Sequence, residues 1–320
     1  MKISVMGCGR WGTFIAWYLD RMGHNVVLWG RENSEHMHIL RTKRKNEYLS
    51  IGETVRLSTD IADAAAHCEV MIVSINAQNL RAFCTQLVQL PIDGKTAVLC
   101  MKGLENKTGL RLSQVVQEVI GSRMNIAVWV GPGHVQDFEA GIPNCMVIDS
   151  DNEGIKKQLV DAFSSDLIRF YYGSDLIGSE VGAAAKNVIG IAAGVLDALH
   201  LTSLKGALMA RGTREVSRLI KAMGGNELSA YGLTHLGDYE ATVFSPHSHN
   251  RKYGETLVTK ETFPYLAEGI ETAEAIMVLK ERYHTDMPIC TAVHETIRDE
   301  KDPKQAIADL FLRSIKEEFS

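Results

Sequence analysis

The sequence predicts an α/β fold with a doubly wound, mostly parallel sheet in residues 1–176, followed by an all-α domain in residues 177–320. In the first half, apolar strand patterns alternate with helical patterns, and a glycine-rich turn joins the first strand to the first helix. Strand patterns then stop near Asp175. Such alternation is typical of parallel sheets covered by helices. A chain of 320 residues is also long enough for two domains.

The first strand, turn and helix carry a specific motif. Residues 2–6 (KISVM) form a β-prone run that leads into GCGRWG, where Gly7, Gly9 and Gly12 match G-x-G-x-x-G. A helical pattern follows, and NVVLWG at 25–30 reads as the next strand. Within a βαβ unit of about 30 residues this motif indicates a Rossmann-type dinucleotide site. The glycines let the main chain approach a pyrophosphate, and the helix N-terminus supplies N–H donors.

The end of the second strand bears on which dinucleotide is bound. Arg31 lies nineteen positions after Gly12, where a guanidinium could bind a 2′-phosphate through paired hydrogen bonds. This favours NADP(H), whereas the neighbouring Glu32 leaves NAD(H) possible. A surface arginine that stacks over adenine without phosphate selectivity is an equal alternative.

Further buried strands are expected at 70–75, 96–103, 126–133 and 144–150. An amphipathic helix is expected at about 80–90. Ligands of doubly wound sheets bind beyond the carboxyl ends of the strands. Four polar or glycine residues fall at such ends, namely Asn76, Lys102, Gly131 and Gly133. They are therefore candidates for ligand contacts, although each could also be ordinary loop chemistry.

The second half reads as helices around a polar loop region. Residues 175–201 form one long pattern of small and apolar residues, and 206–225 form a second, amphipathic one. A loop-rich stretch at 231–257 carries many polar groups, and three further helices follow it. Lys186 lies in the first of these helices, among glycine, alanine, valine and isoleucine. Either its apolar stem lets the ammonium reach water, or Lys186 faces a cleft and transfers a proton.

Composition narrows the class of protein. Hydrophobic residues make up 45% and charged residues 23%, and the formal net charge of -5 gives no electrostatic footprint for nucleic acid. No apolar run reaches the roughly 18 to 20 residues that span a bilayer, and the MKISVMG start is typical of a strand rather than of a signal peptide. The six cysteines are scattered, which predicts reduced thiols in a cytoplasmic protein. Histidine spacing predicts no metal site.

Seven stretches in order carry a resemblance that runs nearly end to end: GCGRWGT, MKGLE, GPGHVQDFEAGIPN, GSEVGAAAKN, HLGDYEAT, SHNRKYG and AEG with Glu268. With these motifs the chain resembles the NAD(P)-dependent glycerol-3-phosphate dehydrogenase family. The resemblance implies a helical domain like that of 6-phosphogluconate dehydrogenase. It also implies a cytoplasmic homodimer that reversibly reduces dihydroxyacetone phosphate to sn-glycerol 3-phosphate, a precursor for glycerophospholipid synthesis.

The resemblance also implies roles for single residues. Lys186 matches the proton donor and acceptor at the C2 oxygen. The implied substrate contacts are Lys102, Gly131, Gly133, Lys186, Asn187, Asp238, Thr242, Ser248, His249 and Asn250. The implied cofactor contacts are Gly7, Gly9, Arg10, Trp11, Gly12, Arg31, Lys102, Val135, His249, Leu266 and Glu268.

The chemistry of a lysine acid agrees with this role. Reduction of a ketone forms an alkoxide, whose charge must be met by a proton or a fixed cation. An ammonium becomes an effective acid when burial or a second cation lowers its pKa toward neutrality. The apolar helix around Lys186, together with Lys102, could supply both effects, while Asp238 would oppose part of the shift and fix the geometry.

Two departures from the family pattern concern the substrate phosphate. His249 stands where the family has arginine, which always carries its charge and can bind a phosphate bidentately. Gly133 stands where the family usually has serine, so a hydroxyl contact would be lost while a backbone contact survives. Arg251 lies nearby, but the family also has an arginine at that position.

Two other interpretations remain open. A two-domain reductase of the ketopantoate or β-hydroxyacid dehydrogenase type also pairs a lysine with a neighbouring asparagine on a helix. A non-catalytic NADP-binding sensor would keep the fold alone. The stretches GDYEAT and SHNRKYG favour the phosphorylated substrate. Retention of the whole polar set favours an enzyme; this set is Lys102, Lys186, Asn187 and Asp238.

Overall fold

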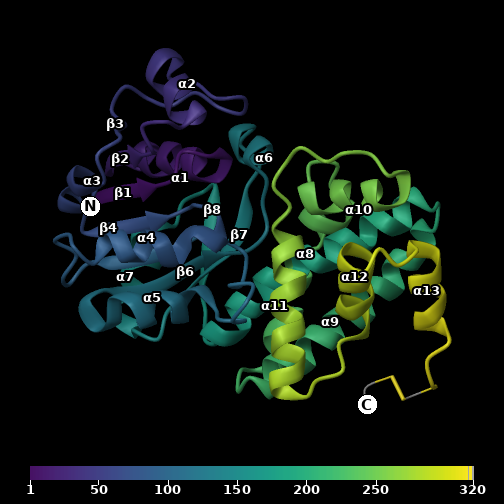
Figure 1. Ribbon diagram of the computed structural model, residues 1–320. Helices are drawn as coiled ribbons and strands as arrows, with labels where there is room; N and C mark the ends of the chain where they lie inside the picture. The colour runs from purple at the N-terminus through teal and green to yellow at the C-terminus, as the bar shows by residue number, and fades with distance from the viewer. Residues whose placement is uncertain (316, 319–320) are drawn as a thin grey trace. The chain divides into compact units, whose positions relative to one another are not determined.

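The computed structural model describes residues 1–315, 317 and 318, and it divides into two compact units (Figure 1). The sheet unit comprises Met1–Met101 and Leu112–Ser174, and the helical unit comprises Lys102–Arg111 and Asp175–Ser320. The short segment Lys102–Arg111 follows a strand of the sheet in sequence but packs with the helices. A single boundary at residue 176 does not describe this division, because it would leave Lys102 with the sheet.

The sheet unit has a mostly parallel sheet, as predicted. Its described strands are β1 (Lys2–Met6), β2 (Asn25–Trp29), β3 (Arg56–Ser58), β4 (Val70–Val73), β5 (Thr96–Leu99), β6 (Asn125–Val130), β7 (Asn144–Asp149) and β8 (Ile168–Tyr172). They lie in the order β3-β2-β1-β4-β5-β6-β7-β8, and β6–β7 is the antiparallel pair. The chain crosses over from β3 to β4, so the strand order reverses between β1 and β4. Doubly wound sheets bind ligands at such a switch point.

The central strands of the sheet consist mainly of apolar residues, as expected for strands with helices on both faces. The strands expected at 2–6, 25–30 and 70–75 are confirmed as β1, β2 and β4. The strand expected at 96–103 is confirmed only in its first half, because β5 ends at Leu99. Strands β4 and β5 are buried at every position. Fully buried parallel strands read as continuous apolar runs rather than alternating ones. The helices of this unit are α1 (Arg10–Arg21), α2 (Glu35–Lys43), α3 (Ile61–His67), α4 (Leu80–Leu87), α5 (Leu112–Ile120), α6 (Val135–Glu139) and α7 (Glu153–Phe163).

The helical unit is built around one buried helix. Its α-helices are α8 (Leu176–Ala198), α9 (Lys205–Ala222), α10 (His249–Thr259), α11 (Glu268–Tyr283), α12 (Pro288–Arg298) and α13 (Pro303–Phe311). Helix α8 packs against α9, α10, α11 and α12, as Figure 1 shows. The core consists mainly of aliphatic side chains, such as Val188, Ile189 and Leu219. Within its own unit α8 therefore has neighbours on several sides.

Glycines set the close approach of α8 and α10. A β-carbon on Gly194 would lie 1.8 Å from the Arg251 carbonyl oxygen, and one on Gly254 would lie 2.0 Å from the Ile191 carbonyl oxygen. No side chain fits at either distance, so the two backbones are in direct contact. Close packing of α8 against α10 thus explains why α8 has glycine at position 194.

Helix α8 is also long and apolar enough to cross a bilayer by length and composition alone, with a mean hydropathy of 1.3 in its best window. However, 83% of that window is buried inside the protein. A buried core helix passes the same test, so this is weak evidence for a membrane span.

Candidate active site

The glycine turn of the sheet unit has a shape that admits a dinucleotide. Gly7 has φ +121°, and a β-carbon there would lie 2.1 Å from the Ser74 carbonyl oxygen; one on Gly12 would lie 1.9 Å from the Gly7 carbonyl oxygen. A β-carbon on Gly9 would meet nothing within 4 Å. Two of the glycines therefore close the turn, while the third leaves open space beside the main chain.

The N-terminus of α1 adds donors at the same place. Gly9 is the N-cap of α1, and no side chain caps the helix there. The first N–H groups of a helix have no partner within it and attract anions. The residues present therefore fit a pyrophosphate at the start of α1.

Three other residues implied as cofactor contacts also lie in this unit. The Arg10 guanidinium lies 5.5 Å from the centre of the Tyr48 ring. Trp11 packs on Phe14, with ring centroids 4.9 Å apart, and its buried indole N–H has no hydrogen-bond partner in the described chain. Val135, at the start of α6, is buried in the core.

Arg31 and Glu32 differ in their surroundings. Glu32 is bound by Arg41, with 3.1 Å between Nη1 and Oε1. Hydrogen bonding to Thr59 and the charge of Arg41 lower the pKa of the Glu32 carboxyl. Arg31 is exposed and has no carboxylate within ion-pair distance among the described residues. The cation at the end of β2 is thus free, whereas the acid beside it is already paired.

The structure gives a reason for glycine at 133. Gly131 and Gly133 follow β6 and have φ +132° and +145°, in the region that favours glycine. A β-carbon on Gly133 would lie 2.3 Å from Cε2 of Phe138, because the α6 ring fills that space. Serine at 133 would need both strained backbone and a displaced ring. The hydroxyl that the family pattern leads one to expect is therefore excluded by local packing.

In the helical unit, the Lys186 ammonium is held by polar groups rather than extended into water. Lys186 lies midway along α8 and is 6% exposed. Its Nζ donates to Thr242 Oγ1 at 2.6 Å and lies 3.0 Å from Asp238 Oδ2. The interpretation in which the side chain reaches solvent is therefore wrong.

One carboxylate joins two lysines. Asp238 is 1% exposed, and its Oδ2 lies 2.7 Å from Lys102 Nζ as well as 3.0 Å from Lys186 Nζ. One buried carboxylate thus holds two ammonium groups close together. Cations fixed in this way can stabilise an anion that forms during a reaction.

The surroundings of Lys186 tune its acidity. Burial lowers its pKa to about 8, and the charge of Lys102 acts in the same direction, while Asp238 opposes both. A group with this pKa is mostly protonated at neutral pH, yet it can lose its proton without a large penalty. The arrangement therefore suits a general acid and base.

Asn187 and Thr242 complete this lysine cluster, which consists of Lys102, Lys186, Asn187, Asp238 and Thr242. The Asn187 amide donates from Nδ2 to the Lys102 carbonyl oxygen at 2.7 Å, which ties the Lys102 segment to α8. The Thr242 hydroxyl accepts from Lys186 and donates to the Asp238 carbonyl oxygen at 2.8 Å. Thr242 lies in a π-helical turn, Glu240–Phe244, a form that is rare and frequent at functional sites.

Ser248, His249 and Asn250, which the family resemblance implies as the loop at the substrate phosphate, lie beside the lysine cluster. Ser248 caps α10 by accepting from the Arg251 N–H at 3.3 Å, and Asn250 Oδ1 accepts from the Gly269 N–H at 2.9 Å. A β-carbon on Gly190 would lie 2.7 Å from Thr242 and 3.4 Å from the Asn250 Cβ. Both Thr242 and Asn250 therefore rest on the same turn of α8.

His249 belongs to this loop as well. Its Nδ1 lies 3.2 Å from the Leu266 carbonyl oxygen, and its ring is 5.1 Å from that of Tyr265, centroid to centroid. This brings the loop near Leu266, which precedes α11, and Glu268, which is the first residue of α11. Within the helical unit, the implied substrate and cofactor contacts thus form one continuous set.

Arg251 does not take the place of the missing arginine. Its guanidinium bonds Asp197, the Glu255 carboxylate at 2.8 Å and the Ser245 carbonyl oxygen at 3.1 Å. These partners occupy it as a structural cation between α8 and α10. The side chain at 249 therefore remains the candidate at the phosphate end.

Sequence reasoning missed two buried residues beside the cluster. His235 Nε2 and the Tyr239 hydroxyl are 2.7 Å apart, and His235 Nδ1 is 2.8 Å from the Gly182 carbonyl oxygen. The available signal was the spacing of His235, Asp238, Tyr239 and Thr242, which are three or four positions apart and so share one side of a helical turn.

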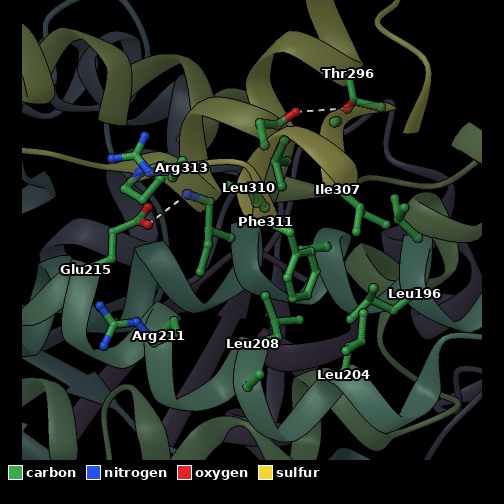
Figure 2. Close-up of a pocket in the computed structure, with 18 of the residues that line it drawn as sticks. Leu196, Leu204, Leu208, Arg211, Glu215, Thr296, Ile307, Leu310, Phe311 and Arg313 are labelled. Carbon is green, nitrogen blue, oxygen red and sulfur yellow. Dashed lines mark hydrogen bonds between the residues drawn. The ribbon is translucent and has the colours of Figure 1, made fainter. Parts of the chain in front are cut away.

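A separate cavity lies among α8, α9, α12, α13 and the segment that follows α13. Its volume is about 960 Å³, its lining is largely apolar, and no residue of the lysine cluster lines it. Figure 2 shows Arg211, Glu215 and Arg313 toward one side and Leu196, Leu204 and Ile307 toward the other. Glu215 accepts the Ile289 and Cys290 N–H groups at 2.8 Å, so its carboxylate caps α12.

Comparisons with known proteins relate both halves of the chain to one family. Residues 2–156 match the model of the NAD-dependent glycerol-3-phosphate dehydrogenase N-terminus, and residues 175–308 match that of its C-terminus. "Glycerol-3-phosphate dehydrogenase [NAD(P)+] 2" of Salinibacter ruber is 33% identical, over 99% of this chain and 96% of that protein. A glycerol-3-phosphate dehydrogenase [NAD(P)+] of Clostridium botulinum is also 33% identical, over 99% of both chains.

Solved structures of glycerol-3-phosphate dehydrogenases are also similar to this chain. Glycerol-3-phosphate dehydrogenase from Coxiella burnetii has a TM-score of 0.91 at 27% identity, over 97% of this chain and 98% of that chain. A PanE/ApbA family ketopantoate reductase from Ralstonia eutropha has a TM-score of 0.62 at 14% identity, over 95% of this chain and 100% of that chain. The second likeness shows a shared fold alone. The matches to both halves and to full-length relatives establish that this chain belongs to the NAD-dependent glycerol-3-phosphate dehydrogenase family.

Proposed function

We propose that this protein reduces dihydroxyacetone phosphate to sn-glycerol 3-phosphate, reversibly, with NAD(P)H as the hydride source. The observation that carries the proposal is the buried lysine cluster, in which Asp238 bridges Lys102 and Lys186 at 2.7 and 3.0 Å. Family membership and the fit of the glycine turn to a pyrophosphate support the cofactor.

Lys186 is the proposed proton donor. When bound, the nicotinamide supplies a hydride to C2 of the ketone, which leaves negative charge on the C2 oxygen. Lys186 Nζ–H donates its proton to that oxygen, so the alcohol forms and the lysine becomes a neutral amine. In the reverse direction the neutral amine takes the hydroxyl proton. The pKa of about 8 supports both roles, because either state of the lysine is accessible near neutral pH.

The neighbours of Lys186 position it and neutralise charge. Asp238 and Thr242 each bind the Lys186 ammonium. With two of its N–H groups directed at these partners, the direction of the third is fixed before the substrate binds. Lys102 adds a second cation and lowers the pKa of Lys186 further. When the proton moves, Lys186 loses its positive charge and the C2 oxygen loses its negative charge. The net charge of the buried site therefore does not change during the transfer.

The phosphate end of the substrate is assigned to Ser248, His249 and Asn250. The family resemblance gives these residues, and their place beside Thr242 along α8 supports the assignment. Backbone contacts from Gly131 and Gly133 are proposed for the same substrate. Asn187 is proposed to orient the substrate hydroxyl end through its link to Lys102.

The cofactor is proposed to be NADP(H), with NAD(H) as the alternative. Arg31 supports this preference, because it is exposed and free of carboxylate partners among the described residues, whereas Glu32 is paired with Arg41. An acid that bound a ribose diol would need its oxygens free. The other proposed cofactor contacts are those that the family resemblance implies, namely Gly7, Gly9, Arg10, Trp11, Gly12, Lys102, Val135, His249, Leu266 and Glu268.

We further propose a cytoplasmic homodimer whose product enters glycerophospholipid synthesis. All six cysteines are free thiols, which supports a reducing compartment. The product is the phosphorylated glycerol backbone on which such lipids are built. The dimer follows from family resemblance.

Steady-state kinetics of a lysine variant tests the function. Lys186→Ala is expected to lower kcat for dihydroxyacetone phosphate by about 10²–10⁴-fold, with NADPH affinity unchanged, since it removes the acid and no cofactor contact. Lys156→Ala is the matched control, because Lys156 is also a buried lysine, bound to Glu153 and to the Gly173 carbonyl oxygen. Its kcat should stay near that of the wild type.

The same assay separates the rival reductase. Ketopantoate is offered beside dihydroxyacetone phosphate, with each of the two cofactors. Turnover of ketopantoate without turnover of dihydroxyacetone phosphate would replace the proposed substrate. Binding of NADPH without turnover of either ketone would favour the non-catalytic sensor.

A further inference from the structure

A histidine and a tyrosine form a buried pair behind the lysine cluster. His235 and Tyr239 are both 0% exposed, and the tyrosine hydroxyl lies 2.7 Å from His235 Nε2. His235 Nδ1 lies 2.8 Å from the Gly182 carbonyl oxygen. A carbonyl oxygen only accepts, so Nδ1 carries the proton and Nε2 accepts from the Tyr239 hydroxyl. Both ring nitrogens are therefore committed.

The ring is neutral, and its neighbours keep it so. Burial lowers the pKa of His235 to about 4; its bond to Gly182 opposes the shift, and the charge of Lys186 adds to it. A protonated ring would place a third cation near Lys186 and Lys102, where Asp238 is the carboxylate that binds both lysines. The pair therefore works as a fixed hydrogen-bonded link rather than as a source of charge.

The link joins the two backbones whose separation sets the cluster. Gly182 lies one helical turn before Lys186 on α8, and Tyr239 directly follows Asp238. A β-carbon on Gly182 would lie 3.1 Å from the His235 Cβ, so the absence of a side chain lets the ring approach α8. The 3-10 turn Leu236–Asp238 and the π-helical turn with Thr242 follow the ring directly.

We propose that His235 and Tyr239 are positioning residues, which hold Asp238 and Thr242 at hydrogen-bonding distance from Lys186 without touching the substrate. The inference rests on the proposed role of Lys186 as proton donor. The bond from His235 to Gly182 ties the 235–239 segment to α8, and the bond from Tyr239 to His235 fixes the turn that carries Asp238. A looser turn therefore lets the Asp238 carboxylate move away from the Lys186 ammonium. Asp238 and Lys102 are the charged groups that act on Lys186, and Asp238 is the one that favours its protonated form.

Tyr239→Phe tests the proposal, because it removes the hydroxyl and keeps the ring. The expected result has three parts: kcat for dihydroxyacetone phosphate falls about tenfold, the KM for NADPH is unchanged, and the alkaline limb of the kcat/KM profile moves to lower pH. The limb moves down because Asp238 stabilises the ammonium less well. A purely structural role would lower the amount of folded enzyme and leave the limb where it is.

Tyr18→Phe is the matched control. Tyr18 is also a buried tyrosine, 2% exposed, and its hydroxyl donates to the Phe163 carbonyl oxygen at 2.5 Å within the sheet unit. Both variants lose one buried hydroxyl, so both should lose thermal stability. The pH of the alkaline limb should move in Tyr239→Phe alone.

Variants of His235 test the proposal if Tyr239→Phe folds poorly. His235→Gln keeps an amide that can donate to Gly182 and accept from Tyr239, so it should retain more activity than His235→Ala. In the double variant His235→Ala with Tyr239→Phe, the shift of the limb should be no larger than in the more affected single variant.

The outcomes separate this inference from the proposed function. If Lys186→Ala keeps full turnover, the lysine role fails and the positioning role fails with it. If Lys186→Ala loses turnover while Tyr239→Phe and His235→Ala keep the wild-type limb, the positioning role alone is overturned.

Discussion

At the scale of single residues, charge decides what each site can do. Lys186 is held by Asp238 and Thr242, and its acidity follows from burial and from Lys102. In the other unit, Arg31 is free while Glu32 is paired with Arg41. The first arrangement supports the proposed proton transfer, and the second supports the proposed contact of Arg31 with a 2′-phosphate.

Replacing Arg31 tests the cofactor preference. Arg31→Ala should lower the ratio of kcat/KM with NADPH to that with NADH by about 10- to 100-fold, since charge-assisted bidentate bonds to a phosphate are lost. Arg169→Ala is the control, because Arg169 is another exposed arginine of the sheet unit. An unchanged ratio would show that Arg31 does not bind the 2′-phosphate.

The sequence identified most of the polar residues that the helical unit brings together. Lys102, Lys186, Asn187 and Asp238 were candidates because they match family motifs, and the structure gives them direct bonds. His235 and Tyr239 also lie in the quoted stretch HLGDYEAT, but the resemblance gave them no role. Their role depends on which backbone carbonyl lies opposite the ring, and residue spacing carries no information on a partner fifty-three positions away.

At the scale of elements, glycines control how helices approach. Gly194 on α8 and Gly254 on α10 leave no room for side chains at their crossing. The same helix carries Lys186, and its Gly190 faces Thr242 and Asn250. The packing that stabilises the helical unit thus also supports the residues that surround the ammonium.

Adding one methyl group at this crossing should be costly. Gly194→Ala should lower the free energy of unfolding by about 1–3 kcal/mol or more, measured by urea denaturation, because a rigid backbone carbonyl blocks the new atom. Gly206→Ala is the control, since a β-carbon there meets nothing within 4 Å. Equal effects of the two variants would contradict the packing argument.

Some elements were not predictable from local patterns. The short β3 and the strand β8 were missed, and β8 alternates buried and exposed side chains, unlike the continuous apolar strands at the centre. It pairs with β7, whose paired residues lie more than twenty positions earlier, so local sequence patterns do not reveal the pairing. Lys102 was expected on the sheet side because it follows β5, yet its segment packs with the helices. The order of residues along the chain does not reveal that a segment between two strands belongs to the helical unit.

At the scale of the whole molecule, the two units have different chemistry. The sheet unit has a glycine turn and a helix N-terminus that fit a dinucleotide. The helical unit has the lysine cluster and the segment Ser248–Asn250, which is proposed to bind the substrate phosphate. Each unit has its own apolar core. This division agrees with a family whose models match the two halves separately.

The central claim is that the buried Lys186 transfers the proton, and the pH dependence of kcat/KM in both directions tests it most directly. The charged lysine is needed for reduction and the neutral lysine for oxidation. With a pKa of about 8, reduction of dihydroxyacetone phosphate should fall as the pH rises through about 8, and oxidation of glycerol 3-phosphate should rise through the same pH. Profiles that stay flat from about pH 6 to 10, or that first turn near the ordinary lysine value of about 10.4, would contradict it.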